Sequence, residues 1–265
     1  MTMRPLAWLA ALGLLMTAAA ATPAPDIARD LAPGGRLRAA INYGNPVLAQ
    51  RSPAGELSGV SVDLARELGR QLGVPVDLVP YDAAGKVTAA AKSGAWDVAF
   101  LAVDPVRANE LSFTAPYVVI EGTYLVPKDS NLRMIEDVDR EGVRIAVGAG
   151  SAYDLYLIRT LKRAFLVRAS TSAGAVDLFV RSKLEAAAGV KQPLVAFAAQ
   201  NPQYRAIEGR FMLIEQAMAT PKGRDAGLTY LRGFVEEMKA SGFVAEALRK
   251  SDQPDAAVAP AAPVR

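Results

Sequence analysis

"WDVAFLAVDPVRANELSFTAPY", residues 96–117, begins as a buried strand and then changes character. Residues 96–103 are almost all apolar, which predicts a strand that is covered on both faces of a sheet. Asp104 is a good N-cap and Pro105 suits the first position of a helix, so a helix is expected to follow. Arg107 then lies in the first turn of that helix, where a cation opposes the macrodipole at a cost of about 0.3–1 kcal/mol.

A bound carboxylate would offset this unfavourable position of Arg107. It could accept two hydrogen bonds from the guanidinium group and others from the free backbone N–H groups at the same helix end. The sequence equally allows an arginine that faces solvent, or one that pairs with Glu110. Arg107 is therefore a candidate anion-binding residue with two structural alternatives.

Apolar residues recur at strand and helix spacing on both sides of this stretch. The predicted strands are residues 36–42, 74–81, 96–103, 122–127, 143–150, 165–170, 184–190 and 211–220, and the predicted helices are residues 59–73, 85–94, 151–164, 172–183 and 224–251. The order strand, helix, strand, helix, strand occurs twice, which predicts an α/β fold of two lobes with a cleft between them. In such sheets, ligands bind at the carboxyl ends of the strands.

Composition excludes several classes of function. The chain of 265 residues suits one large domain or two lobes. It has no cysteine and no histidine, which excludes disulfides, thiol nucleophiles and histidine-based triads. The formal net charge is +3 with acidic and basic residues interspersed, so we expect no nucleic-acid partner.

The two ends of the chain differ from the rest. Residues 1–21 combine Arg4, an apolar run and a block of small residues, and they predict a signal peptide cleaved near Ala21. A membrane anchor is the alternative, but the apolar run is short for a bilayer span. Residues 253–265 have the composition of a disordered tail.

A second helix end is predicted around residues 148–154. Gly148 and Gly150 form a turn after a strand, and Ser151 with Asp154 has the pattern of a capping box. The stretch is similar to a truncated dinucleotide fingerprint, but Tyr153 stands where the third glycine belongs. We therefore expect no nucleotide, no other cofactor and no metal.

Five motifs, in this order, resemble the periplasmic solute-binding proteins of polar amino-acid ABC transporters, the family 3 extracellular solute-binding domains. They are "GELSGVSVDLARELGRQLG", "AAAKSGAWDVAF" with "DPVRANELSFTAPY", "VRIAVGAGSAYDLYL", "KLEAAAGVKQPLVAF" and "QAMATPKGRDAGLTYLRGFVEEMKASGFVAEALRK". The resemblance covers residues 36–251. It implies a two-lobed type II periplasmic binding protein fold with two hinge strands, in which residues 22–121 and 217–252 form lobe one and residues 122–216 form lobe two.

The resemblance also implies where a ligand would bind. Arg107 matches the carboxylate-binding arginine of the family, and Asp104 replaces the threonine of that motif. The expected ligand contacts are Asn42, Tyr43, Tyr81, Phe100, Ala102, Arg107, Gly150, Ser151 and Lys191. Glu121 and Glu215 occupy matching positions on the two hinge strands, where they could be hydrogen-bonding partners or touch the ligand.

One departure from the family concerns the ligand. The aspartate that usually holds an α-ammonium group is replaced by Val190, and Lys191 follows it. Lys191 could be solvated or could meet a second anionic group. The anion-binding end is kept and the ammonium-binding end is lost, so we expect an organic acid, or an acid with a second polar or anionic group.

The function that follows is capture of a small carboxylate by lobe closure in the periplasm, by a monomer that presents it to the membrane permease of an ABC transporter. The alternatives are an enzyme similar to cyclohexadienyl dehydratases, which share this fold, and the sensing domain of a receptor. Elimination chemistry would need a positioned acid in the cleft, for which Glu121 or Glu215 are the candidates.

Overall fold

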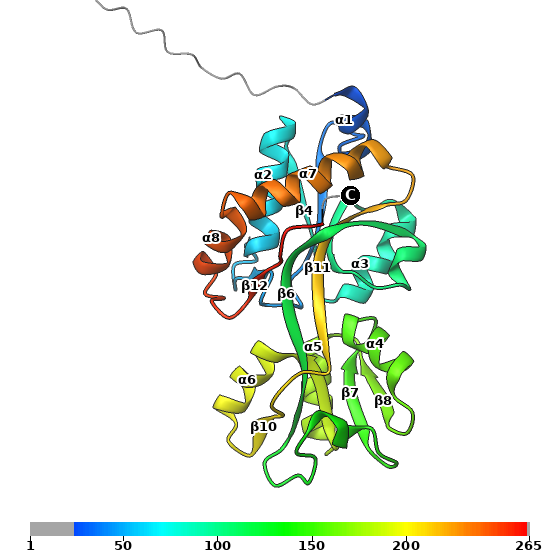
Figure 1. The fold of residues 1–265 in the computed structure, drawn as a ribbon, viewed down its shortest axis with the longest axis vertical. Coiled ribbons are helices and arrows are strands. Elements are labelled where there is room, and N and C mark those ends of the chain that lie inside the picture. The colour runs from blue at the N-terminus through cyan, green and yellow to red at the C-terminus, as the bar shows by residue number, and fades with distance from the viewer. Residues whose placement is uncertain (1–23, 264–265) are drawn as a thin grey trace, which may run out of the picture.

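The computed structural model describes residues 24–263, and the expected signal peptide, residues 1–21, lies outside them. Two lobes are stacked along the long axis of the molecule, and the long strands β6 and β11 run between them (Figure 1). Hydrogen bonds join the strands of both lobes into one sheet with the order β4-β1-β5-β11-β6-β9-β7-β8, while β10 and β12 also pair with β6. The predicted two-lobed α/β fold is confirmed.

The elements have the following bounds. The strands are β1 (Leu37–Asn42), β2 (Gln50–Arg51), β3 (Leu57–Ser58), β4 (Val76–Tyr81), β5 (Val98–Ala102), β6 (Leu111–Pro127), β7 (Arg144–Gly148), β8 (Phe165–Ala169), β9 (Ala186–Val190), β10 (Tyr204–Ala206), β11 (Met212–Pro221) and β12 (Ala257–Val258). The α-helices are α1 (Pro25–Leu31), α2 (Val60–Leu72), α3 (Ala84–Ala90), α4 (Ala152–Thr160), α5 (Ser172–Arg181), α6 (Lys191–Gln200), α7 (Asp225–Ala240) and α8 (Phe243–Lys250).

Lobe one is built on the parallel strands β4, β1 and β5. Helix α2 covers them because Leu64, Leu68 and Leu72 recur every four residues and are all buried. The helix ends at Gly73, whose left-handed backbone a glycine adopts at little cost. Strand β5 is buried along its whole length, as its apolar sequence predicts.

Strand β6 crosses from lobe one to lobe two and is longer than the sequence predicts. The predicted strand begins at residue 122, whereas β6 begins at Leu111. Pro116 argues against a strand, but it pairs with Ala217 where the ladder between β6 and β11 is irregular. A proline is tolerated at such a bulge because no regular ladder hydrogen bond is lost there.

Lobe two repeats the pattern with β9, β7 and β8. Strands β7 and β8 are parallel, β9 is parallel to β7, and β9 joins the lobe to β6 through antiparallel pairing. Helix α6 was not predicted. It begins at Lys191 and contains Pro193, which is tolerated because the N–H groups of a first helical turn have no intrahelical acceptor.

Within the described part of the tail, residues 253–263, a short strand forms where the composition predicts disorder. Strand β12 pairs with Val118 and Val119 of β6, on the edge that β11 leaves open. Ala259 N–H donates to the Tyr117 carbonyl at 3.0 Å, and Ala259 is 4% exposed. Backbone pairing therefore orders a segment whose side chains give little indication of structure.

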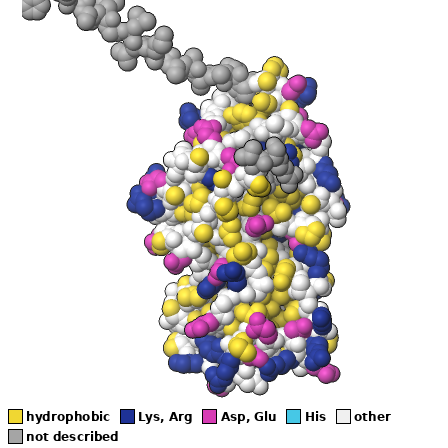
Figure 2. All heavy atoms as spheres, in the orientation of Figure 1, with side chains coloured by type: hydrophobic (Ala, Val, Ile, Leu, Met, Phe, Trp, Pro, Cys, Tyr) yellow, Lys and Arg dark blue, Asp and Glu magenta, His cyan; other side chains and the backbone are white. Residues whose placement is uncertain are grey.

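The surface carries mixed charge. Figure 2 shows acidic and basic side chains interspersed over one face, with hydrophobic side chains gathered along the middle of the molecule. Within residues 24–263, no helix has the length and apolar character needed to cross a membrane.

Candidate functional site

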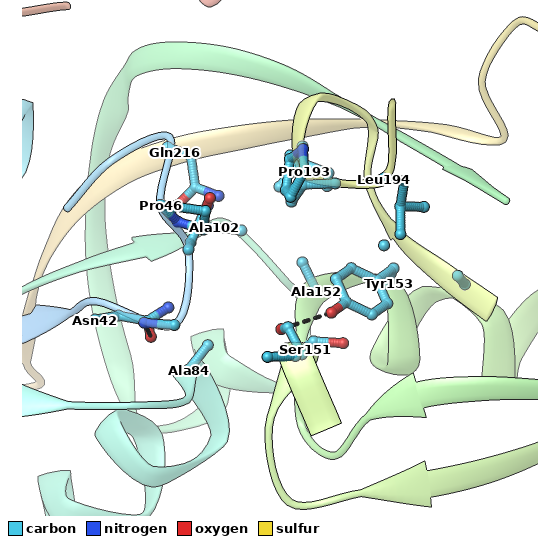
Figure 3. Close-up of a pocket in the computed structure, with 18 of the residues that line it drawn as sticks. Asn42, Pro46, Ala84, Ala102, Ser151, Ala152, Tyr153, Pro193, Leu194 and Gln216 are labelled. Atoms are coloured by element: carbon cyan, nitrogen blue, oxygen red, sulfur yellow. Dashed lines mark hydrogen bonds between the residues drawn. The ribbon is translucent and has the colours of Figure 1, made fainter. Parts of the chain in front are cut away.

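A cavity of about 280 Å³ lies between the two lobes. Its lining includes, from lobe one and the hinge, Asn42, Asn45, Phe100, Ala102, Arg107, Ile214 and Gln216, and from lobe two, Ser151, Ala152, Tyr153, Val176, Asp177, Val190, Pro193, Leu194 and Phe197. Figure 3 shows the two sets facing each other across the cavity, with Asn42 and Gln216 on one side and Tyr153 and Leu194 on the other.

Arg107 is the buried cation of this cavity. It is 1% exposed, and its Nη1 and Nη2 atoms donate to the carbonyls of Ala102 and Gly150, each at 2.9 Å. Its Nε–H has no acceptor in the described part of the chain. Burial lowers the pKa of Arg107 to about 10, and the nearby charge of Asp104 acts in the opposite direction.

Both structural alternatives for Arg107 are wrong. It does not face solvent, and Glu110 pairs with Lys92 at 2.8 Å instead. The predicted helix is also corrected, because only a 3-10 turn, Arg107–Asn109, forms. Asp104 caps this region by accepting from the Val106 N–H at 2.8 Å. The macrodipole of a full helix therefore does not explain Arg107, and its burial in the cavity becomes the relevant feature.

The N-terminus of α4 lies beside Arg107. Ser151 is the N-cap and accepts from the Asp154 N–H at 3.1 Å, while Asp154 accepts from Gly150 N–H at 2.9 Å rather than from Ser151. The predicted capping box is thus half formed. Ala152 and Tyr153 line the cavity in the first helical turn, where backbone N–H groups have no intrahelical acceptor. This end of the cavity favours an anion.

The two lobes also touch each other outside the lining of the cavity. Asp104 of lobe one accepts from Arg159 of α4 at 2.8 Å. Gly85 of α3 lies against lobe two so closely that a Cβ atom built on it would be 2.7 Å from the Ala149 carbonyl oxygen. The structure is therefore a closed arrangement in which only a glycine fits at position 85.

The glutamates of the hinge strands point away from the cavity. Ile214 and Gln216 of β11 line the cavity, and Glu215 between them faces the other side because side chains alternate along a strand. Glu121 pairs with Leu213 in the ladder and therefore shares the face of Glu215.

Lys191 belongs to the same hinge surface. It donates to Glu121 at 2.8 Å and does not line the cavity. Arg210 donates to the other oxygen of Glu121 at 2.6 Å. Hydrogen bonds from Lys191 and Arg210 lower the pKa of Glu121 although partial burial opposes this. The expected ligand contact of Lys191 is thus replaced by an ion pair within the hinge.

The other expected contacts divide into two groups. Asn42, Phe100, Ala102 and Ser151 line the cavity, whereas Gly150 meets Arg107 through its carbonyl. Tyr43 and Tyr81 do not line it: Arg51 lies over the Tyr43 ring at 5.4 Å, and Tyr81 packs against the cluster around Trp96.

Sequence reasoning missed several lining residues. Gln216 is 5% exposed and could have been found from its alternation with Glu215 on a hinge strand. Val176 and Asp177 lie one helical turn after Ser172 and Ala173, and all four line the cavity from one face of α5. Leu194 lies on α6, a helix that the sequence does not predict. Among residues 24–263, no group of three acidic side chains is arranged to hold a metal ion.

Solved structures share this fold. The solute receptor for L-cysteine of Neisseria gonorrhoeae is 22% identical, with 86% of this chain and 94% of that chain covered and a TM-score of 0.75. A binding component of an ABC transporter from Wolinella succinogenes, complexed with lysine, is 24% identical, with coverage of 82% and 95% and a TM-score of 0.71. An ancestral amino acid-binding protein, described as a precursor of cyclohexadienyl dehydratase, is 24% identical, with coverage of 82% and 95% and a TM-score of 0.69.

A search of curated protein sequences finds no match. Residues 37–251 match the bacterial extracellular solute-binding proteins, family 3, over most of the chain and through both lobes. The order of the motifs, the two crossing strands and the cavity between the lobes agree with this match. The chain therefore belongs to family 3 of the bacterial extracellular solute-binding proteins.

Proposed function

We propose that this protein captures a small carboxylate-bearing solute between its lobes outside the cytoplasm and presents the closed form to the permease of an ABC transporter. Arg107 carries the proposal. Its guanidinium group is buried in the cavity, and its Nε–H has no acceptor among the described residues. The two acids nearest to it in sequence, Asp104 and Glu110, are paired with Arg159 and Lys92. A buried cation without an anionic partner is costly, so a ligand carboxylate would complete the site.

The position of the carboxylate follows from the contacts of Arg107. Its Nη2 atom donates to the Gly150 carbonyl, two residues before Ala152 begins α4. A carboxylate against Nε of Arg107 could therefore also accept from the first-turn N–H groups of α4. Such a group would bind to both lobes at once, which favours the closed form.

The partner and the location are supported by the family match. The protein of Wolinella succinogenes was crystallised as a binding component of an ABC transporter with lysine, and lysine is itself a carboxylate. We therefore infer a permease partner and a location outside the cytoplasm from the family match.

Binding fits the cavity better than catalysis does. Glu121 and Glu215, the acids that an elimination reaction would need, point away from the cavity. Asp177 is the one acid among the described residues that lines it, and Asp177 is exposed. A general acid works within hydrogen-bonding reach of the reacting group, in a protected environment. A turnover assay with prephenate and arogenate should therefore show no product.

The experiment is calorimetry of a panel of amino acids and organic acids against the wild-type protein and Arg107→Lys. Lysine cannot replace two backbone contacts and a bidentate ligand contact at once. Losing one charged hydrogen bond costs about 1.5–3 kcal/mol, so the affinity for the best carboxylate should fall about 10- to 150-fold.

Arg232→Lys is the matched control, because Arg232 is exposed on α7 and the same substitution there should leave binding unchanged. Thermal unfolding of both variants shows whether the fold is kept. If Arg107→Lys binds the best carboxylate within twofold of wild type, Arg107 is not the anchor.

A further inference from the structure

The lobe-two side of the cavity carries several apolar side chains. Helix α5 contributes Val176, and helix α6 contributes Pro193, Leu194 and Phe197; these four residues are called the apolar wall. Leu194 is 3% exposed and belongs to the lobe-two core, whereas Val176 and Phe197 are half-buried. Pro193 and Leu194 lie across the cavity from Asn42 and Gln216 (Figure 3).

The polar groups near the apolar wall are already paired or exposed. Tyr153 donates its hydroxyl hydrogen to Ser172 Oγ at 2.7 Å. Lys191, which might have met a second anionic group, donates to Glu121 instead. Asp177 is the one charged side chain that described lobe-two residues contribute to the lining, and it would repel a second carboxylate.

We propose that the apolar wall is a subsite for a hydrocarbon group, and that the ligand is a small carboxylate with an aliphatic or aromatic body. The inference rests on the proposed function, because Arg107 must hold the carboxylate for the body to reach this wall. A second anionic group against the wall would be repelled by Asp177, and an ammonium group would lose hydration and find only the exposed carboxylate of Asp177. A methylene group buried there should raise the affinity about fourfold.

The size of the cavity limits the ligand. Its volume of about 280 Å³ lies near the lower end of the range for small-molecule sites, so it suits a small ligand. Phe100 and Ile214 contribute large apolar side chains to the lining from lobe one and the hinge, and they are 2% and 1% exposed. A branched or ring-shaped body would therefore contact apolar side chains from both lobes.

The first test is calorimetry with acids that share a carboxylate and differ in the body. From propanoate to 4-methylpentanoate, three carbons are added, so the affinity should rise about 60-fold. Hexanoate should bind at least tenfold more tightly than pentanedioate, which places a negative charge where hexanoate places a methyl group. It should also bind more tightly than 5-aminopentanoate, whose ammonium group only the exposed Asp177 could pair with. Phenylacetate tests an aromatic body.

The second test changes the wall without changing its shape. Val176→Thr replaces a methyl group by a hydroxyl group and should lower the affinity for 4-methylpentanoate about tenfold, while the affinity for propanoate changes less than twofold. Val195→Thr is the matched control, because Val195 is 47% exposed on α6 and does not line the cavity. Phe197→Ala provides a second wall variant if Val176→Thr unfolds.

The outcomes separate the two proposals. A flat series, in which propanoate and 4-methylpentanoate bind alike, would overturn the hydrocarbon subsite and leave the carboxylate proposal intact. Tighter binding of 5-aminopentanoate or pentanedioate than of hexanoate would do the same. Binding of no carboxylate by the wild-type protein would overturn both.

Discussion

Closure of the lobes can be blocked by one methyl group at Gly85. Gly85 lies in the first turn of α3, and a Cβ atom there would be 2.7 Å from the Ala149 carbonyl oxygen and 3.2 Å from Gly150 Cα. Both atoms belong to the backbone of lobe two, so no side-chain rotation relieves the contact. The lobes of Gly85→Ala must therefore stay further apart than they do here.

This contact sets the free-energy cost of lobe closure in Gly85→Ala. Overpacking of this kind costs about 1–3 kcal/mol, so the affinity for any ligand that requires closure should fall about 5- to 150-fold. Within α3 itself, alanine is favoured over glycine by about 0.5–1 kcal/mol. The ligand-free variant should therefore unfold at the wild-type temperature or above it, although it binds ligand more weakly.

Calorimetry with the best carboxylate and small-angle X-ray scattering with and without it measure the two effects. Gly233→Ala is the matched control, because Gly233 lies within α7 and a Cβ atom there meets nothing within 4 Å. The control should gain stability and bind normally. If Gly85→Ala binds as tightly as wild type and becomes equally compact, the bound form does not bring α3 against residues 149–150.

Two further predictions concern ion pairs. Asp104→Asn keeps a capping side chain but loses the ion pair with Arg159, so it should weaken ligand binding. A double-mutant cycle with Arg159→Met should give a coupling energy of about 0.5–1 kcal/mol. If calorimetry shows that the effects of the two substitutions are additive, the pair does not contribute to binding. Asp97 is fully buried, which by itself raises its pKa, but hydrogen bonds from Arg38 and Arg224 outweigh burial and hold the pKa below 3.8. The stability from Asp97 is therefore complete above about pH 4 and is lost as the pH falls through the lowered pKa. Because Arg38 and Arg224 are partly exposed, Asp97→Asn should cost about 1.5–3 kcal/mol at pH 7 in urea unfolding and flatten the loss of stability below pH 4. An unchanged acid profile would contradict this.

Most strands and helices of both lobes could be predicted because their signals are local. Strand β5 is a continuous apolar run, and α2 shows its buried face in the spacing of Leu64, Leu68 and Leu72. Strand β12 could not be predicted, because its order comes from the open edge of β6, which lies far away in the sequence. The start of β6 at Leu111 could not be predicted, because Pro116 argues against a strand. The proline is tolerated only through the irregular pairing with Ala217 of β11.

The part of the site that could be predicted is Arg107, because its position in the sequence already indicates a role in binding an anion. Arg107 could be selected because it follows a buried strand and matches a family motif, but its contact with Gly150 joins residues from different lobes. The apolar wall was missed because Leu194 and Phe197 belong to α6, which shows no amphipathic pattern and contains a proline. Lys191 was misplaced for the same reason, since only the start of α6 directs it toward Glu121.

Recognition of charge and recognition of shape lie on different parts of this cavity. Arg107 of lobe one and the N-terminus of α4 of lobe two meet at Gly150, so a carboxylate between them gains contacts that exist only when the lobes are closed. A ligand shifts a conformational equilibrium only by its difference in affinity for the two states. In the proposed binding mode, the carboxylate therefore couples binding to closure for every acid that fits. The apolar wall belongs to lobe two, and under the proposal of a hydrocarbon subsite its contacts select among those acids by their bodies.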